Sequence, residues 1–268
     1  MSTNGRSSAS DSALVGYDLL FRAFEKFVRE GTLGQSYLLY GDREIGKQSF
    51  AHRLACYLET GAWEAGERPL LDMVTAHPDE KGTIGIDQVR DLRRFLSETP
   101  LASPRRTALV DDAESLTAEA QGALLKLVEE PSPHALLIFT TYEPGALLAP
   151  LRSRFTKIYC PRLPREAVRR FLIDRQGLPE HRAAALAEES FGRIGRALRL
   201  AGRAPEPATE GRELEMELES AIMDLRKRGA ARNAAKLAWL LEREMLVKRY
   251  NLNPNLQRKA MRHILDNS

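Results

Sequence analysis

The sequence has little cysteine, little net charge and no long apolar run, and each absence removes a class of protein. Cys56 and Cys160 are its only cysteines, far apart and without a C-x-x-C pair. They support neither a disulfide framework nor a cysteine zinc site, and they favour a cytoplasmic location. The 40 basic and 37 acidic side chains leave a formal net charge of +3, so bulk charge does not argue for nucleic-acid binding.

No apolar stretch is long enough to span a bilayer, and the first residues lack the basic and apolar regions of a signal peptide. Residues 1–13 are small and polar, and we expect them to form a disordered leader. The hydrophobic fraction of 43% is ordinary for a globular core. We therefore expect a folded cytoplasmic chain without a membrane partner.

Short apolar runs alternate with amphipathic helical patterns over residues 14–162. The runs SYLLY, LLDMVTA, RTALV and ALLIFTT predict strands, and helices are expected over residues 16–30, after residue 47, and in IDQVRDLRRFLS and LTAEAQGALLKLVEE. This alternation predicts an α/β domain with a parallel sheet covered on both faces. Ligands of such sheets bind at the carboxyl ends of the strands.

Only helical patterns follow the prolines at 161 and 164. Three short ones occupy residues 163–204, and a longer one begins at Glu210 and is followed by at least two more. The sequence therefore predicts three domains, over residues 14–162, 163–204 and 205–268.

A phosphate-loop pattern, G-x-x-x-x-G-K-[ST], fits residues 41–48 except at its last position. Gly41, Gly46 and Lys47 lie between an expected strand and an expected helix, so backbone amides and the lysine could bind phosphates. Gln48 replaces the hydroxyl that holds magnesium, and its neutral amide is a poor substitute. The loop is that of a nucleotide enzyme, the remnant of one, or a chance match.

Two carboxylates follow the expected strand RTALV. Asp111 is at the position of a magnesium-organising carboxylate. Asp112 stands where many phosphate-loop ATPases have a glutamate that orients water, and it is shorter by one methylene, which misplaces a general base. By themselves, the two aspartates favour the alternative of an exposed turn at the end of the strand.

Arginines supply two further candidates. Arg154, in LRSRF, is either a surface residue or an arginine finger that reaches a neighbouring subunit. The second candidate is a group of five arginines, namely Arg90, Arg93, Arg94, Arg105 and Arg106. Such a group is typical of a solvated face, and the alternative is a patch that follows DNA phosphates. The five histidines have no metal-ligand spacing, so no metal site is expected.

The segments GDREIGK, ALVDDAESLTAEAQGALLKLVEEPSPHALLIFTTYEP and LRSRF, in this order, resemble the clamp-loader branch of the AAA+ proteins. The stretch from Asp112 to Phe155 is the most specific part, and the resemblance extends through residues 192–198 into YNLNPNLQ. Within that branch, the altered positions and HPDEKGTIGIDQVR resemble the delta prime subunits of bacterial DNA polymerase III.

The resemblance implies an AAA+ core, a small helical lid and a C-terminal helical collar that joins subunits. It implies a largely non-hydrolysing accessory subunit of a DNA-directed DNA polymerase that helps load a sliding clamp on primed DNA. Its partners would be subunits of the gamma/tau and delta types. Arg154 would be an arginine finger for a neighbouring ATPase subunit, Thr141 would lie in the sensor 1 region, and Gly195 aligns with an arginine that senses nucleotide in hydrolysing subunits.

The resemblance also carries departures and an alternative. No cofactor is expected to be required, although ATP or ADP could bind weakly. Residues 56–80 lack the four-cysteine zinc module of many family members, so no zinc is expected, and the region after Pro207 is shorter than the usual collar. The alternative is an ATP-hydrolysing gamma/tau-type subunit or another AAA+ ATPase, which Lys47 and Asp111 support.

Overall fold

The structure, a computed structural model, describes residues 15–63, 69–202, 210–230, 232–249 and 254–266. The chain divides into two compact units, residues 1–204 and 205–268. The predicted division into three domains stays a prediction. The expected leader, residues 1–13, and the first part of YNLNPNLQ lie outside the described residues.

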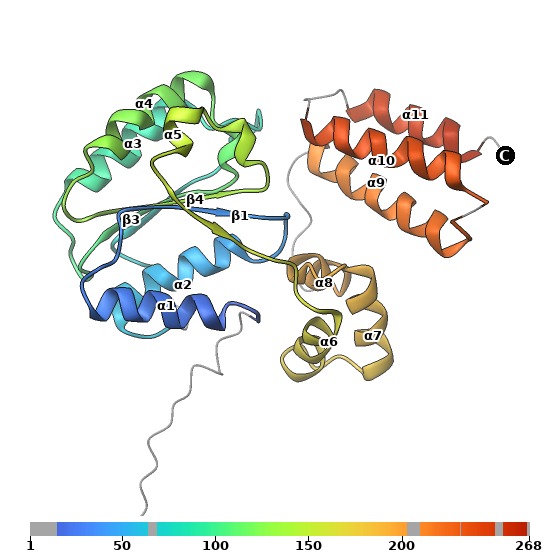
Figure 1. The fold of residues 1–268 in the computed structure, drawn as a ribbon, viewed down its shortest axis with the longest axis horizontal. Helices are drawn as coiled ribbons and strands as arrows, with labels where there is room; N and C mark the ends of the chain where they lie inside the picture. The colour runs from blue at the N-terminus through green and yellow to red at the C-terminus, as the bar shows by residue number, and fades with distance from the viewer. Residues whose placement is uncertain (1–14, 64–68, 203–209, 231, 250–253, 267–268) are drawn as a thin grey trace, which may run out of the picture. The chain divides into compact units, whose positions relative to one another are not determined.

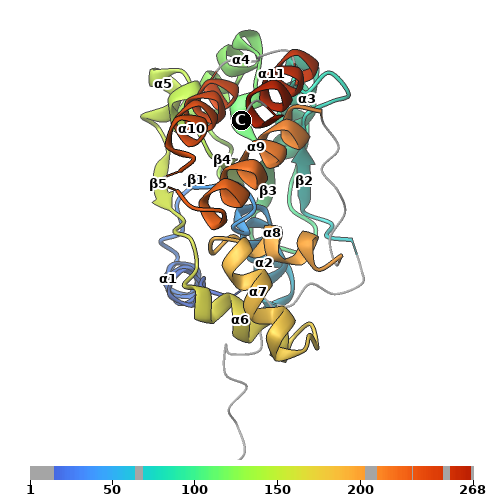
Figure 2. The ribbon, with the colours of Figure 1, turned by 90° about the vertical axis from the view of Figure 1, so that its right-hand side faces the viewer.

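A five-stranded parallel sheet forms the centre of the first unit, in the order β2-β3-β4-β1-β5. Figure 2 shows β2 and β5 at its two edges. The strands are β1 (Ser36–Tyr40), β2 (Met73–Ala76), β3 (Arg106–Val110), β4 (Ala135–Thr141) and β5 (Thr156–Tyr159). The predicted parallel α/β sheet is confirmed. The sequence interpretation missed β5, because this mostly exposed edge strand has no continuous apolar run.

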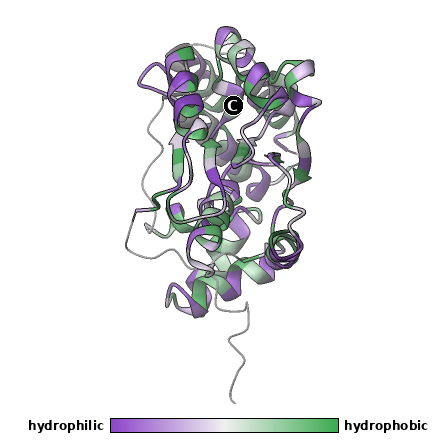
Figure 3. Ribbon diagram, turned by 90° about the vertical axis from the view of Figure 1, so that its left-hand side faces the viewer, coloured by the Kyte–Doolittle hydropathy of each residue, from purple (hydrophilic) through white to green (hydrophobic). Residues whose placement is uncertain are grey.

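Helices cover both faces of the sheet (Figure 1). Helices α1 (Asp18–Arg29) and α2 (Lys47–Thr60) cover one face, and α3 (Ile86–Ser97), α4 (Ala118–Glu129) and α5 (Ala149–Arg152) cover the other. Figure 3 shows hydrophilic and hydrophobic residues mixed along the helices, as expected of elements with one face on a core.

Side chains alternate between the two faces along each strand and build two cores. Leu39, Leu109 and Ile138 pack with residues of α1 and α2. Their chain neighbours Leu38 and Val110 pack with residues of α3 and α4. Strands buried on both faces explain the continuous apolar runs in the sequence.

Three helices follow β5 in the first unit, namely α6 (Arg165–Asp174), α7 (Glu180–Glu189) and α8 (Ile194–Leu200). They enclose a separate core that contains Phe171, Leu172 and Ala197. Helix α8 is tied to the loop after β1, because the backbone N–H of Gly195 donates to the carbonyl of Glu44 at 2.7 Å. The Arg199 guanidinium donates to the Glu44 carboxylate at 3.0 Å.

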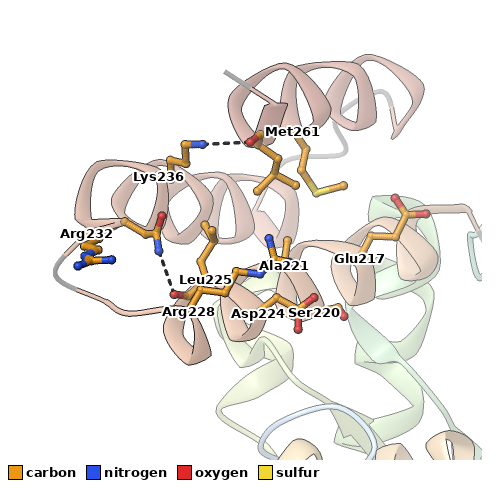
Figure 4. A pocket seen from close by; sticks show the side chains of 11 residues that line it. Glu217, Ser220, Ala221, Asp224, Leu225, Arg228, Arg232, Lys236 and Met261 are labelled. Atoms are coloured by element: carbon orange, nitrogen blue, oxygen red, sulfur yellow. Dashed lines mark hydrogen bonds between the residues drawn. The ribbon is translucent and has the colours of Figure 1, made fainter. Parts of the chain in front are cut away.

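The second unit contains α9 (Glu210–Lys227), α10 (Ala234–Arg249) and α11 (Pro254–Asp266). Leu214, Leu218 and Leu240 contribute to its core. The side chains around an open cleft in this unit include Leu225, Met261, Arg228, Arg232 and Lys236 (Figure 4). All residues of this cleft belong to the second unit, so the cleft shares no residue with the predicted phosphate loop.

Arg106 does not belong to a solvated face, so that part of the sequence interpretation is wrong. It begins β3, is only 5% exposed, and its guanidinium lies 3.4 Å from the Asp72 carboxylate. It also donates to the carbonyl of Thr99 at 2.9 Å. A guanidinium can be buried here because it has both a carboxylate and a carbonyl as partners.

Asp72 is the matching buried anion, 2% exposed. Its carboxylate accepts backbone N–H bonds from Leu101, Ala102 and Ser103, at 2.8, 2.6 and 2.8 Å. Burial acts to raise the pKa of Asp72, but these amides and Arg106 outweigh it and hold the pKa below its usual value.

We expect Asp72→Asn to lower the free energy of unfolding by about 2–4 kcal/mol at neutral pH, because it removes the buried anion of Arg106 and leaves only the exposed carboxylate of Glu98 beside it. The folded-state pKa of Asp72 is depressed, so its contribution is present above the unfolded-state pKa and is lost as the pH falls through the lower, folded-state value. Urea denaturation at several pH values measures both effects. The gap between wild type and variant should shrink below about pH 4.

Asp91→Asn is the matched control. Asp91 is an exposed aspartate of α3 that pairs with Arg94 at 3.6 Å. We expect a change within about 0.5 kcal/mol for this variant, since exposed ion pairs contribute little. If Asp72→Asn were equally mild, the buried pair would not be an anchor of the fold.

Candidate phosphate site

The loop between β1 and α2 has the geometry of a phosphate cradle. Gly41 has a φ of +146°, and a Cβ built there would lie 2.3 Å from the carbonyl oxygen of Cys160. Gly46 has a φ of +98° and precedes the first turn of α2. Only glycine fits the first position without a backbone shift, and the second orients the N-terminus of a 14-residue helix toward the loop.

Lys47 is buried, and its ammonium group bends back over this loop. Nζ donates to the carbonyls of Gly41 at 2.9 Å and Asp42 at 2.6 Å. Burial lowers the pKa of Lys47 to about 8, although nearby carboxylates, chiefly that of Glu114, act to raise it. Most Lys47 side chains therefore carry a charge at neutral pH, as phosphate binding requires.

The magnesium position of the loop is different. Gln48 is exposed on the first turn of α2, and so is Ser49, the next hydroxyl residue. Residues 41–47 therefore fit a phosphate group, while position 48 offers no hydroxyl ligand to a magnesium ion. Among the described residues, no group of three or more His, Cys, Asp and Glu side chains could hold a metal ion.

Asp111 directly follows β3 and is fixed by a neighbouring strand. Its carboxylate accepts a hydrogen bond from the Thr140 hydroxyl at 2.5 Å, and Nδ1 of His77 lies 3.7 Å away. The backbone N–H of Asp112 donates to the same hydroxyl at 3.3 Å. The side chain of Asp111 is only 17% exposed, so the alternative of an exposed turn does not describe it.

Glu114 is a site residue that the sequence interpretation missed. It lies in η2 (Ala113–Ser115), and its Oε2 accepts a hydrogen bond from the Thr141 hydroxyl at 2.7 Å. Its Oε1 lies 3.9 Å from Nη2 of Arg43, and the Arg43 guanidinium lies over the Tyr142 ring. Burial raises the pKa of Glu114, while the Thr141 hydroxyl and the two nearby cations oppose that shift. The only feature of the sequence that could have identified Glu114 as a site residue is its position in VDDAE, three residues after Asp111.

Helix α8 closes one side of the loop. A Cβ built on Gly195 would lie 3.0 Å from the carbonyl oxygen of Glu44 and 3.1 Å from its Cβ. Arg193 and Arg196, on either side of Gly195, are buried, at 6% and 4% exposure. The position predicted to have lost a sensing arginine is therefore in tight contact with the phosphate loop.

Arg154 is held away from this loop. It donates to the carbonyl of Pro150 at 2.6 Å and forms an ion pair with Glu129 at the end of α4. Its side chain is 36% exposed. Among the described residues, the structure thus brings together Lys47, Asp111 and Thr141, and it places Arg154 with partners on α4 and α5.

No described helix is long and apolar enough to cross a bilayer.

Known proteins resemble parts of this chain. The sequence model of the family described as "DNA polymerase III, delta subunit" matches residues 17–164. The DNA polymerase III subunit delta' of Pseudomonas aeruginosa is 35% identical over 167 residues, which cover 57% of this chain and 50% of that protein. The DNA polymerase III subunit delta' of Escherichia coli is 33% identical, over 58% of this chain and 45% of that protein.

Two matches of lower sequence identity include another DNA polymerase III subunit and a solved structure of similar fold. The DNA polymerase III subunit gamma/tau of Mycobacterium tuberculosis is 31% identical, over 54% of this chain and 28% of that protein. The solved structure of the Thermotoga maritima RuvB Holliday junction branch migration motor superposes with a TM-score of 0.51 at 19% identity. It covers 75% of this chain and 62% of that one, and this likeness concerns the fold alone.

The chain spans about half the length of the two delta' relatives. The matches confirm the resemblance that was drawn from the phosphate loop, from the segment between Asp112 and Phe155, and from LRSRF. Since the family model covers more than half of its residues, this chain belongs to the DNA polymerase III delta subunit family.

Proposed function

We propose that the chain is a delta prime-type subunit of a clamp loader that hydrolyses little or no ATP itself and supplies Arg154 to a neighbouring ATPase subunit. The observation that carries this proposal is the contrast between two parts of the molecule. The phosphate loop has no hydroxyl at Gln48, whereas Arg154 is partly exposed and has an ion-pair partner that a phosphate can replace.

Three features weaken hydrolysis in the chain's own site. Gln48 offers no hydroxyl to magnesium, and the carboxylate of Asp112 is one methylene short of the expected general base. Gly195 has no side chain with which to contact a nucleotide. ATP or ADP, when bound, would supply the phosphates that Lys47 and the first amides of α2 hold, without a required cofactor or zinc.

Arg154 suits the role of an arginine finger because its present partners are weak. An exposed ion pair such as that with Glu129 contributes little energy, so the guanidinium can leave it when a more highly charged anion approaches. A γ-phosphate of the neighbouring subunit is such an anion and accepts bidentate hydrogen bonds from arginine. The finger then stabilises the charge of the transition state.

The remaining parts follow from the same assignment. Helices α6–α8 would be the lid and α9–α11 the collar that joins subunits. The partners would be gamma/tau-type and delta-type subunits, the sliding clamp and primed DNA, in the cytoplasm. The support is that relatives of this chain are named subunits delta' and gamma/tau of DNA polymerase III.

We expect Arg154→Ala to lower the ATPase rate of the assembled loader, in the presence of clamp and primed DNA, by about tenfold or more, because one transition-state charge is lost. Steady-state phosphate release measures the rate, and size-exclusion chromatography checks assembly. Arg29→Ala at the end of α1 removes an exposed arginine outside the candidate DNA patch and should leave the rate unchanged. A fully active Arg154→Ala loader would refute the finger.

The alternative, an ATP-hydrolysing subunit of the gamma/tau type, is favoured by the charged Lys47 close to Asp111. It predicts magnesium-dependent hydrolysis by the purified chain alone, lost in Lys47→Ala. We expect no such turnover in a single-turnover assay with an excess of the chain over ATP, since the magnesium hydroxyl is missing. Hydrolysis by wild type that disappears in Lys47→Ala would replace our proposal with this alternative.

A further inference from the structure

Glu114 brings a negative charge into the region where a phosphate would bind. Its side chain is 8% exposed. Nη2 of Arg43 lies 3.9 Å from its Oε1 and the Thr141 hydroxyl donates to its Oε2 at 2.7 Å, while the ammonium group of Lys47 acts on it electrostatically. These are a guanidinium, an ammonium and a hydroxyl, the same kinds of group that bind a phosphate in a nucleotide site.

The carboxylate is incompletely satisfied. Its Oε2 has the Thr141 hydroxyl as donor, but its Oε1 is buried and accepts no hydrogen bond, with Nη2 of Arg43 at 3.9 Å as its ion-pair partner. A carboxylate that served only to stabilise the fold would be expected to have donors on both oxygens, as the buried Asp72 has. Hydrogen bonding alone therefore does not account for a glutamate at this position, and its interactions with the nearby cations are the other contribution.

We propose that Glu114 is an internal anion that competes with the phosphates of a nucleoside di- or triphosphate for Lys47 and Arg43, and so sets the phosphate affinity of the loop. Gly41, Gly46 and Lys47 keep the residue types of a phosphate cradle. What opposes a phosphate is a fixed negative charge beside the same cations. The inference uses the proposed function only in treating residues 41–47 as a phosphate loop.

The surrounding charges do not remove this competition. Asp111 and Asp42 also act on Lys47, so the ammonium group already has several carboxylates nearby before any ligand arrives. An incoming phosphate adds further negative charge to this cluster, at a site where burial weakens solvent screening. Neutralising the most buried of these carboxylates should therefore increase anion binding more than neutralising an exposed one.

Glu114→Gln tests the proposal, because it removes the charge but keeps the length of the side chain and an oxygen for the Thr141 hydroxyl. Isothermal titration calorimetry of the full chain with pyrophosphate and with ADP, at pH 7 without magnesium, measures affinity while Lys47 is mostly charged. We expect binding to be about tenfold tighter, or more, than in wild type. Glu119→Gln, an exposed glutamate of α4, makes the same change in net charge and should leave affinity unchanged.

Two further results decide the matter. Adding Lys47→Gln to Glu114→Gln should abolish the gain in affinity, since the released cation would be gone. Equal or weaker binding by a folded Glu114→Gln variant would overturn the proposal. So would loss of the folded state, judged by circular dichroism, in both Glu114→Gln and Glu114→Ala, because the carboxylate would then be a structural requirement. These experiments use the isolated chain and do not depend on whether Arg154 acts in a neighbour.

Discussion

The close approach of Gly41 to the end of β5 is the constraint on which the first unit depends. At this point the backbone N–H of Gly41 donates to the carbonyl of Thr141 at 3.3 Å, and that of Cys160 donates to the carbonyl of Tyr40 at 2.8 Å. The chain therefore leaves β1 between two strands that hold it on either side, and a side chain at Gly41 would strike the Cys160 carbonyl. From this fixed start, the loop leads to α2, which begins at Lys47.

Two buried charge clusters of this unit differ in a way that separates structure from function. Asp72 has three backbone amides and Arg106 as partners, and a fully satisfied cluster of this kind anchors β2 to β3. Glu114, beside Lys47, has one oxygen without a donor. Incompletely satisfied buried charge is found at functional sites more often than in a structural cluster, which is why we propose a functional role for Glu114 and a structural one for Asp72.

Sequence patterns predicted what depends on local chemistry and missed what depends on distant contacts. The apolar runs of β1, β3 and β4 are local signals and located the sheet, and the glycines of the loop are local signals that predicted the turn between β1 and α2. The partners of Glu114 include Thr141, 27 residues away, and Arg199 reaches Glu44 across 155 residues. No short motif encodes such pairs. Arg106 was misassigned for the same reason, because its burial depends on a carboxylate in another strand-end loop.

Gly195 of α8 packs tightly against the loop between β1 and α2. At Gly195 the backbone of α8 comes so close to Glu44 that an added Cβ would lie 3.0 Å from a backbone oxygen. An arginine at this position, as the resemblance leads one to expect of a hydrolysing subunit, would require α8 or the loop to move. The backbone hydrogen bond from Gly195 to Glu44 and the Arg199 ion pair instead hold α8 against the loop. The absence of a side chain at Gly195 therefore goes together with the tight packing of α8 on the loop. A loop held by these hydrogen bonds does not require a bound nucleotide to define its shape, which is consistent with the proposed role of a subunit that hydrolyses little or no ATP itself.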